Sequence, residues 1–125
     1  RYTELTREAA QSLATGADLS DEARNSENAI RMRRNAALLA VWLNDERLMQ
    51  RLTAGKPASE LDASLAWLDF LLRYRVANGD AREKVAIEAG DWLNTAKLSE
   101  HVKSQGQRDL LVMRKGESLR IAPWE

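Results

Sequence analysis

Cysteine is absent from this chain of 125 residues, and histidine occurs once, as His101. The lack of cysteine excludes disulfide bonds, thiolate zinc sites and cysteine nucleophiles. A single histidine excludes a metal centre built from several imidazole ligands. The chain also has no apolar run of about 18 residues, the length that a membrane-spanning helix requires. The sequence therefore predicts no membrane segment, and we expect a cytoplasmic protein.

An excess of either charge is also missing. Lysine and arginine number 19, aspartate and glutamate also number 19, and the formal net charge is +0. This balance argues against a strongly basic nucleic-acid coat protein and against a polybasic membrane-binding protein.

The glycines are isolated from one another, so the sequence contains no phosphate-binding loop, nucleophile elbow or dinucleotide-binding fingerprint. His101 has Glu100 beside it, but Ser99 and Ser104 are placed too close along one helix to complete a catalytic triad. We interpret His101 as a surface histidine. We therefore predict no catalytic, cofactor-binding or metal-binding residues, no cofactor, and a protein that is not an enzyme.

Helix-forming residues dominate what is present. The chain has 19 alanines and 18 leucines, against five valines and three isoleucines. Alanine and leucine are the strongest helix formers, whereas β-branched residues favour strands. We expect one mainly α-helical domain over residues 1–125, a compact bundle of five or six helices. Because the chain begins with Arg1, we expect it to be cut from a larger protein.

Apolar spacing and capping residues place the helices at 3–15, 20–43, 46–54 and 60–77, then from 80 to a break at 94–95, with a restart that ends at 104. Gly16 is predicted to end the first helix, and Ser59 to cap the fourth. Asn78–Gly79 is predicted to end the fourth helix. Asp80 and Glu83 have the spacing of a capping box that opens the fifth.

The last segment differs from the preceding ones in the order of its apolar and turn-forming residues. Leu110–Met113 is an apolar run, Arg114–Lys115–Gly116 has the composition of a turn, and Leu119 and Ile121 follow. This order predicts a small C-terminal β-hairpin over residues 107–122. The alternative is a C-terminal tail that folds back on the helices.

The expected core consists of apolar residues on the inner stripes of the predicted helices. Its members are Leu38, Val41, Trp42, Leu48, Leu52, Leu61, Leu65, Leu68, Leu72, Val85 and Trp92.

Trp42, Trp67 and Trp92 recur at intervals of 25 residues, and each is followed by leucine and then asparagine or aspartate. This spacing suggests either a duplicated helix–break–helix unit of about 50 residues or a repeat of one helix every 25 residues. The alternative is the ordinary composition of buried helices, in which such a spacing arises by chance.

The basic residues of the last third suggest one alternative function. Helix, break, helix and hairpin is the order of a winged-helix domain, with Arg114–Lys115 at the tip of its wing. Under this hypothesis the candidate nucleic-acid contacts are Lys97, Lys103, Arg108, Arg114 and Lys115.

The leading hypothesis is a non-enzymatic helical adaptor that binds another protein through a helical groove or a surface patch. It follows from the missing catalytic and cofactor motifs together with the neutral charge. Nucleic-acid binding through a winged-helix-like C-terminal third is the alternative.

Overall fold

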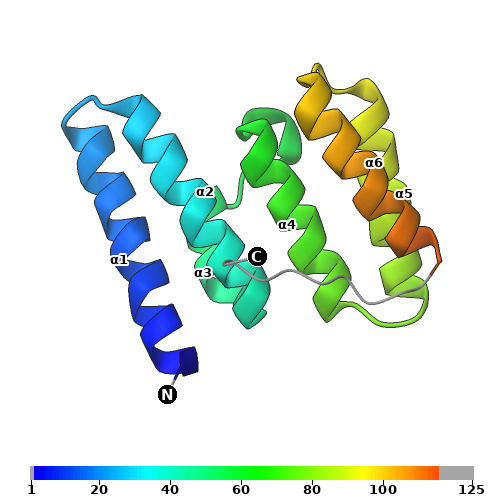
Figure 1. Ribbon diagram of the computed structural model, residues 1–125, viewed down its shortest axis with the longest axis horizontal. Helices are drawn as coiled ribbons and strands as arrows, with labels where there is room; N and C mark the ends of the chain where they lie inside the picture. Colours follow the sequence, from blue (N-terminus) through cyan, green and yellow to red (C-terminus); the bar gives the residue numbers. More distant parts are fainter. Residues whose placement is uncertain (1, 116–125) are drawn as a thin grey trace.

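The computed structural model describes residues 2–115, which form α-helices joined by short connections (Figure 1). The elements are α1 (Tyr2–Glu22), α2 (Ser26–Leu43), α3 (Glu46–Thr53), the 3₁₀ turn η1 (Ala58–Glu60), α4 (Ala63–Val76), α5 (Asp80–Thr95) and α6 (Glu100–Arg114). The mainly α-helical class predicted from composition is confirmed. Within residues 2–115, no helix combines the length and the apolar character needed to cross a membrane.

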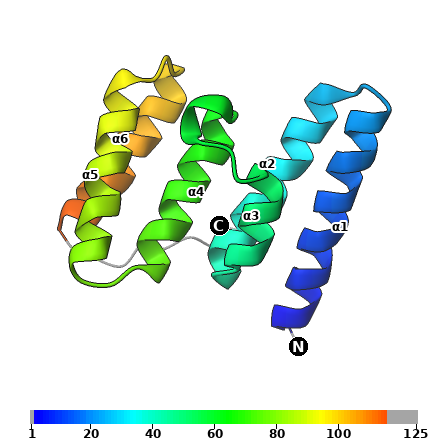
Figure 2. The same ribbon diagram turned by 180° about the vertical axis from the view of Figure 1, so that it is seen from behind.

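The helices stand in a row (Figure 1). α1 packs against α2, α2 against α4, and α4 against α5 and α6. The view from behind shows α3 on the back of α2, where it also contacts α4 (Figure 2). α1 therefore forms one edge of the row, and the α5–α6 pair forms the other.

The predicted end of the first helix at Gly16 is wrong, because α1 continues to Glu22. Ala10, Ala14 and Ala17 are buried, and Gly16 lies so close to Met32 of α2 that an added Cβ would overlap the methionine side chain. The glycine allows close packing of α1 on α2 instead of ending the helix.

The start of the second helix also lies later than predicted. The break comes at Arg24, whose φ of 59° is left-handed. α2 then begins at Ser26, with the side chain of Asn25 accepting a hydrogen bond from the backbone nitrogen of Asn28. The predicted start at residue 20 is wrong because packing against α2 extends α1 beyond the point that local propensity favours.

Ser59 does not cap α4, because it lies within η1. Asp62 is the cap and accepts hydrogen bonds from the backbone nitrogens of Ser64 and Leu65.

The predicted break at Asn78–Gly79 is confirmed. Gly79 has a φ of 56° and occupies the N-cap of α5, so Asp80 is the first helical residue and the predicted capping box is wrong.

The predicted hairpin over residues 107–122 is wrong over its first half, because residues 107–114 belong to α6. An apolar run of four residues is compatible with either a strand or a buried helix face. Here Leu110 and Met113, three residues apart, are both buried on one side of the helix. The second half, residues 116–122, lies outside the described residues.

Most of the predicted core is confirmed, with two degrees of burial. Val41, Leu48, Leu52, Leu65, Leu72 and Val85 are buried, and Leu38, Trp42, Leu61, Leu68 and Trp92 are partly buried. Trp67, which is 5% exposed, stacks on Trp92 with ring centroids 6.1 Å apart.

The three regularly spaced tryptophans occupy different positions in their helices. Trp42 lies one residue before the end of α2, Trp67 lies near the start of α4, and Trp92 lies three residues before the end of α5. Asn44 adopts a left-handed cap, whereas Asn94 is helical. The spacing of 25 residues therefore does not correspond to a repeated structural position.

Candidate interaction groove between α5 and α6

The described residues contain no group of three or more histidine, cysteine, aspartate or glutamate side chains arranged to hold a metal ion. His101 is exposed in the first turn of α6. Grooves and exposed apolar side chains are the remaining candidates for a binding site among the described residues.

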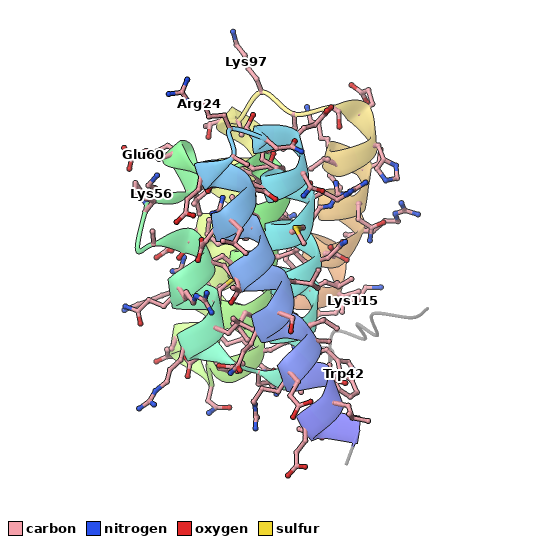
Figure 3. All side chains as sticks on the ribbon, turned by 90° about the vertical axis from the view of Figure 1, so that its left-hand side faces the viewer. Arg24, Trp42, Lys56, Glu60, Lys97 and Lys115 are labelled. Carbon is pink, nitrogen blue, oxygen red and sulfur yellow. The ribbon has the colours of Figure 1, made fainter. Side chains whose placement is uncertain are left out.

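The five candidate nucleic-acid contacts are not brought together on one surface. Lys97 lies in the connection before α6, at the opposite end of that helix from Lys115 (Figure 3). Lys103 and Arg114 are eleven residues apart, about three turns, and share one side of α6. Arg108 lies roughly 140° around the helix from Lys103. The strand expected for the wing is helical through Arg114, so residues 107–114 lack the winged-helix geometry.

A groove of about 420 Å³ lies between α5, the end of α4 and the C-terminal end of α6. Ala86, Gly90, Tyr74 and Met113 contribute to its lining and are all buried residues. The groove therefore has a largely apolar floor.

Gly90 creates the close approach of the two helices beneath the groove. A Cβ at this position would lie 3.3 Å from Cδ2 of Leu110 and 3.6 Å from Nη2 of Arg114. A larger residue would push α6 outward and change the shape of the groove. The hydroxyl of Tyr74 donates a hydrogen bond to the carbonyl oxygen of Met113 at 3.2 Å, which ties the end of α6 to α4.

Arg82 makes one wall of the groove rigid. Its Nε donates hydrogen bonds to the carbonyl oxygens of Tyr74, at 3.1 Å, and Ala77, at 3.0 Å. Its guanidinium carbon lies 4.6 Å from the centroid of the Tyr74 ring. The Arg82 charge is thereby directed at the C-terminal carbonyls of α4, where the helix dipole favours a cation.

Ile87 is the exposed apolar side chain of this surface. It lines the groove and is 59% exposed. Glu83, Asp91 and Arg114 supply charges of both signs around it. An apolar centre with a charged rim is the general anatomy of a protein-binding surface.

A second polar feature is a partly buried hydrogen bond between α4 and α6. Nε1 of Trp67 donates a hydrogen bond to Oδ2 of Asp109 at 2.8 Å. Burial raises the pKa of Asp109, and the hydrogen bonds from Trp67 and Gln105 partly offset that effect. Because this carboxylate joins α4 to α6 and does not line the groove, we interpret it as structural.

The groove is not evident from the sequence. A glycine at position 90 by itself only weakens a helix relative to alanine, and Ile87 is one of many apolar residues. The available signal was the position of Ile87 on the polar side of the helix, between Lys84 and Asp91.

Comparisons of the chain with protein-family models, with curated proteins and with solved structures found no match. The function therefore has to be inferred from the geometry of the surface.

Proposed function

We propose that this domain is a non-enzymatic interaction module that binds a segment of another protein in the groove between α5 and α6. The observation that carries the proposal is Ile87, 59% exposed beside a groove with a buried apolar floor. Exposing a large apolar side chain to water is unfavourable, and a partner that covers it gains roughly 25 cal/mol for each Å² of apolar area buried.

The charges around the groove support a specific chemistry for the partner segment. Its rim carries both acidic and basic groups, Glu83 and Asp91 against Arg114. A matching segment presents one apolar side chain to the floor and flanks it with charges of both signs. An amphipathic helix or a short extended peptide meets this description.

The test begins with peptides selected from a random display library against the intact domain. Binding of each selected peptide is then measured by fluorescence polarisation to the native domain and to the variant Ile87→Glu. Loss of a central apolar contact is expected to cost about 2 kcal/mol, roughly a thirtyfold rise in Kd. The matched control is Ile30→Glu on α2, because Ile30 is also an exposed isoleucine, at 44%, and does not line this groove.

The same preparations discriminate protein binding from nucleic-acid binding. A gel-shift assay at low salt with random duplex and single-stranded probes reports nucleic-acid affinity, which falls steeply with salt. Micromolar binding that is abolished by Arg114→Ala combined with Lys115→Ala, in a variant still folded by circular dichroism, would lead us to abandon the proposed function. Selected peptides that bind Ile87→Glu as tightly as the native domain would also overturn it.

A further inference from the structure

The two edges of the helix row are built differently. α1 makes its extensive contacts with α2, through the side that buries Ala10, Ala14 and Ala17. Figure 3 looks onto this edge, with α1 nearest the viewer and side chains pointing outward from it. The opposite side of α1 therefore faces away from the other helices of residues 2–115.

That outer side of α1 combines apolar and acidic residues. Leu5 is 55% exposed and Leu19 is 59% exposed. They are fourteen residues apart, about four helical turns, so they lie on one stripe. Glu4, Glu8 and Glu22 are exposed along the same side. Arg7, at the border of this side, forms an ion pair with Asp45, with 3.8 Å between its Nε and Oδ2 of the aspartate.

The outer side of α6, opposite its buried residues Leu110 and Met113, combines apolar and basic residues. Leu111 is 56% exposed. Arg108 lies almost one turn before it and Lys115 about one turn after it, and both are exposed. The acidic residue of this side, Glu100, lies in the first turn, about two turns before Arg108.

The directions of the two helices make these stripes complementary. α1 and α6 run in opposite directions along the bundle (Figure 1). A second copy that has the same orientation and lays its α1 along this side of α6 would therefore place the two helices antiparallel. The sequence Glu4–Leu5 with Glu8 would then meet Arg108, Leu111 and Lys115, so that leucine meets leucine and each acid meets a base. Glu22 would lie near Lys97 at the other end.

We propose that the domain associates head to tail with a second copy of itself, through the outer side of α1 on one molecule and the outer side of α6 on the next. The basic residues of this contact lie on a different side of α6 from the groove residue Arg114, since Arg108 is roughly 120° and Lys115 roughly 100° from it around the helix. The contact stands independently of the proposed function. Because the two surfaces differ, the contact is heterologous and continues into an open chain or a ring.

Sedimentation velocity over a concentration series, from about 1 μM to about 1 mM, tests the proposal. The native domain is expected to grow in mass continuously with concentration. Raising the salt from about 0.05 M to about 0.5 M should weaken the association, since it reduces the Debye length to well below 10 Å.

Charge reversal separates the two surfaces. One variant carries Glu4→Lys with Glu8→Lys, and the other carries Arg108→Glu with Lys115→Glu. Each alone is expected to remain monomeric, with Kd raised roughly tenfold or more, because like charges then oppose each other. In an equimolar mixture the native α6 of one variant can pair with the native α1 of the other, and the reversed α1 with the reversed α6, so the mixture should associate again and grow with concentration. A variant with all four substitutions should associate again.

The matched control reverses charges outside the contact, with Lys56→Glu and Glu60→Lys, two exposed residues at η1 (Figure 3). It should behave as the native domain does. Circular dichroism confirms that every variant is folded. A native domain that stays monomeric at the highest concentration would overturn the proposal. Failure of the equimolar mixture to associate would also overturn it. So would continued association of the Arg108→Glu, Lys115→Glu variant, which would indicate a symmetric α1–α1 contact.

Discussion

At the scale of single residues, the hydrogen bond between Trp67 and Asp109 holds a partly buried carboxylate between α4 and α6. Burial is the main influence on Asp109 and raises its pKa above the ordinary value of 3.8. Asp69 is shifted in the same direction, also by burial. The pKa of Asp18 is lowered, chiefly by its hydrogen bond with Arg33. The partly buried carboxylates Asp109 and Asp69 therefore change the dependence of stability on pH in the opposite direction from Asp18.

We expect Asp109→Asn to flatten part of the dependence of stability on pH. As pH rises above 3.8, the unfolded state releases the Asp109 proton, whereas the folded state, whose pKa for this group is raised, retains it to a higher pH. Stability therefore falls as pH rises through this window, until the folded carboxyl has also ionised. Asparagine removes this contribution and still offers an oxygen to Trp67. The measurement is the urea midpoint as a function of pH.

Asp18→Asn is the comparison for that experiment. Because the folded pKa of Asp18 is lowered, its contribution is lost as pH falls through the folded value, and the native stability rises with pH below 3.8. The two substitutions should therefore change the profile with opposite signs. Identical profiles for Asp109→Asn and the native domain would show that burial of this carboxylate has no energetic consequence.

At the scale of elements, α5 and α6 pack through two glycines that each face a leucine of the other helix. Gly90 on α5 faces Leu110, and Gly106 on α6 faces Leu93. A Cβ at Gly106 would lie 2.7 Å from Cδ1 and 3.2 Å from Cδ2 of Leu93. Leu93 is only 1% exposed, so it has little room to move. The separation of the two helices depends on these small residues.

Gly106→Ala is expected to destabilise the domain by about 1–2 kcal/mol. Alanine gains about 1 kcal/mol in helix propensity over glycine, but overpacking a filled interface costs about 1–3 kcal/mol, and the rigid surroundings of Leu93 favour the upper part of that range. Gln107→Ala, at the exposed neighbouring position, should change stability by less than about 0.5 kcal/mol. Urea unfolding measures both. A stabilised Gly106→Ala variant would contradict the packing of α6 on α5.

At the scale of the whole molecule, the size of the buried side chains differs between the two halves of the bundle. Trp67, Phe70 and Trp92 form an aromatic cluster where α4 meets α5, with ring centroids 5.7–6.1 Å apart. The interface of α1 and α2 instead buries alanines. Large rings bury far more apolar surface than methyl groups do. The α4–α5–α6 half should therefore contribute more of the stability than the α1–α2 half.

We expect Trp67→Ala to cost about 3–5 kcal/mol, the range for a buried aromatic side chain replaced by alanine. Trp42→Ala should cost less, because Trp42 is only partly buried. Trp67→Phe keeps a ring in the cluster but removes the donor to Asp109, so its cost should lie between those of Trp67→Ala and the native residue. The three urea midpoints provide the measurement. A larger loss for Trp42→Ala than for Trp67→Ala would place the main core elsewhere.

Local signals in the sequence predicted the helical class, the bounds of α3 to within one residue and the break at Gly79. Each of these depends on caps, propensities and backbone conformations that involve only neighbouring residues. Asp45, for example, accepts a hydrogen bond from the backbone nitrogen of Leu48, three residues along the chain. The groove could not be predicted in this way, because it depends on the approach of Leu110 to Gly90.

The sequence by itself therefore determined that the chain is helical and where several helices begin and end. Only the tertiary structure decided that Gly16 lies inside α1, that Leu110–Met113 is helical, and that Ile87 borders a groove. Glycine weakens an isolated helix, but it permits close packing when a neighbouring helix lies opposite. Likewise, an apolar run becomes a strand or a helix according to the surface that covers it. Those neighbours come from distant parts of the chain, and no local pattern identifies them.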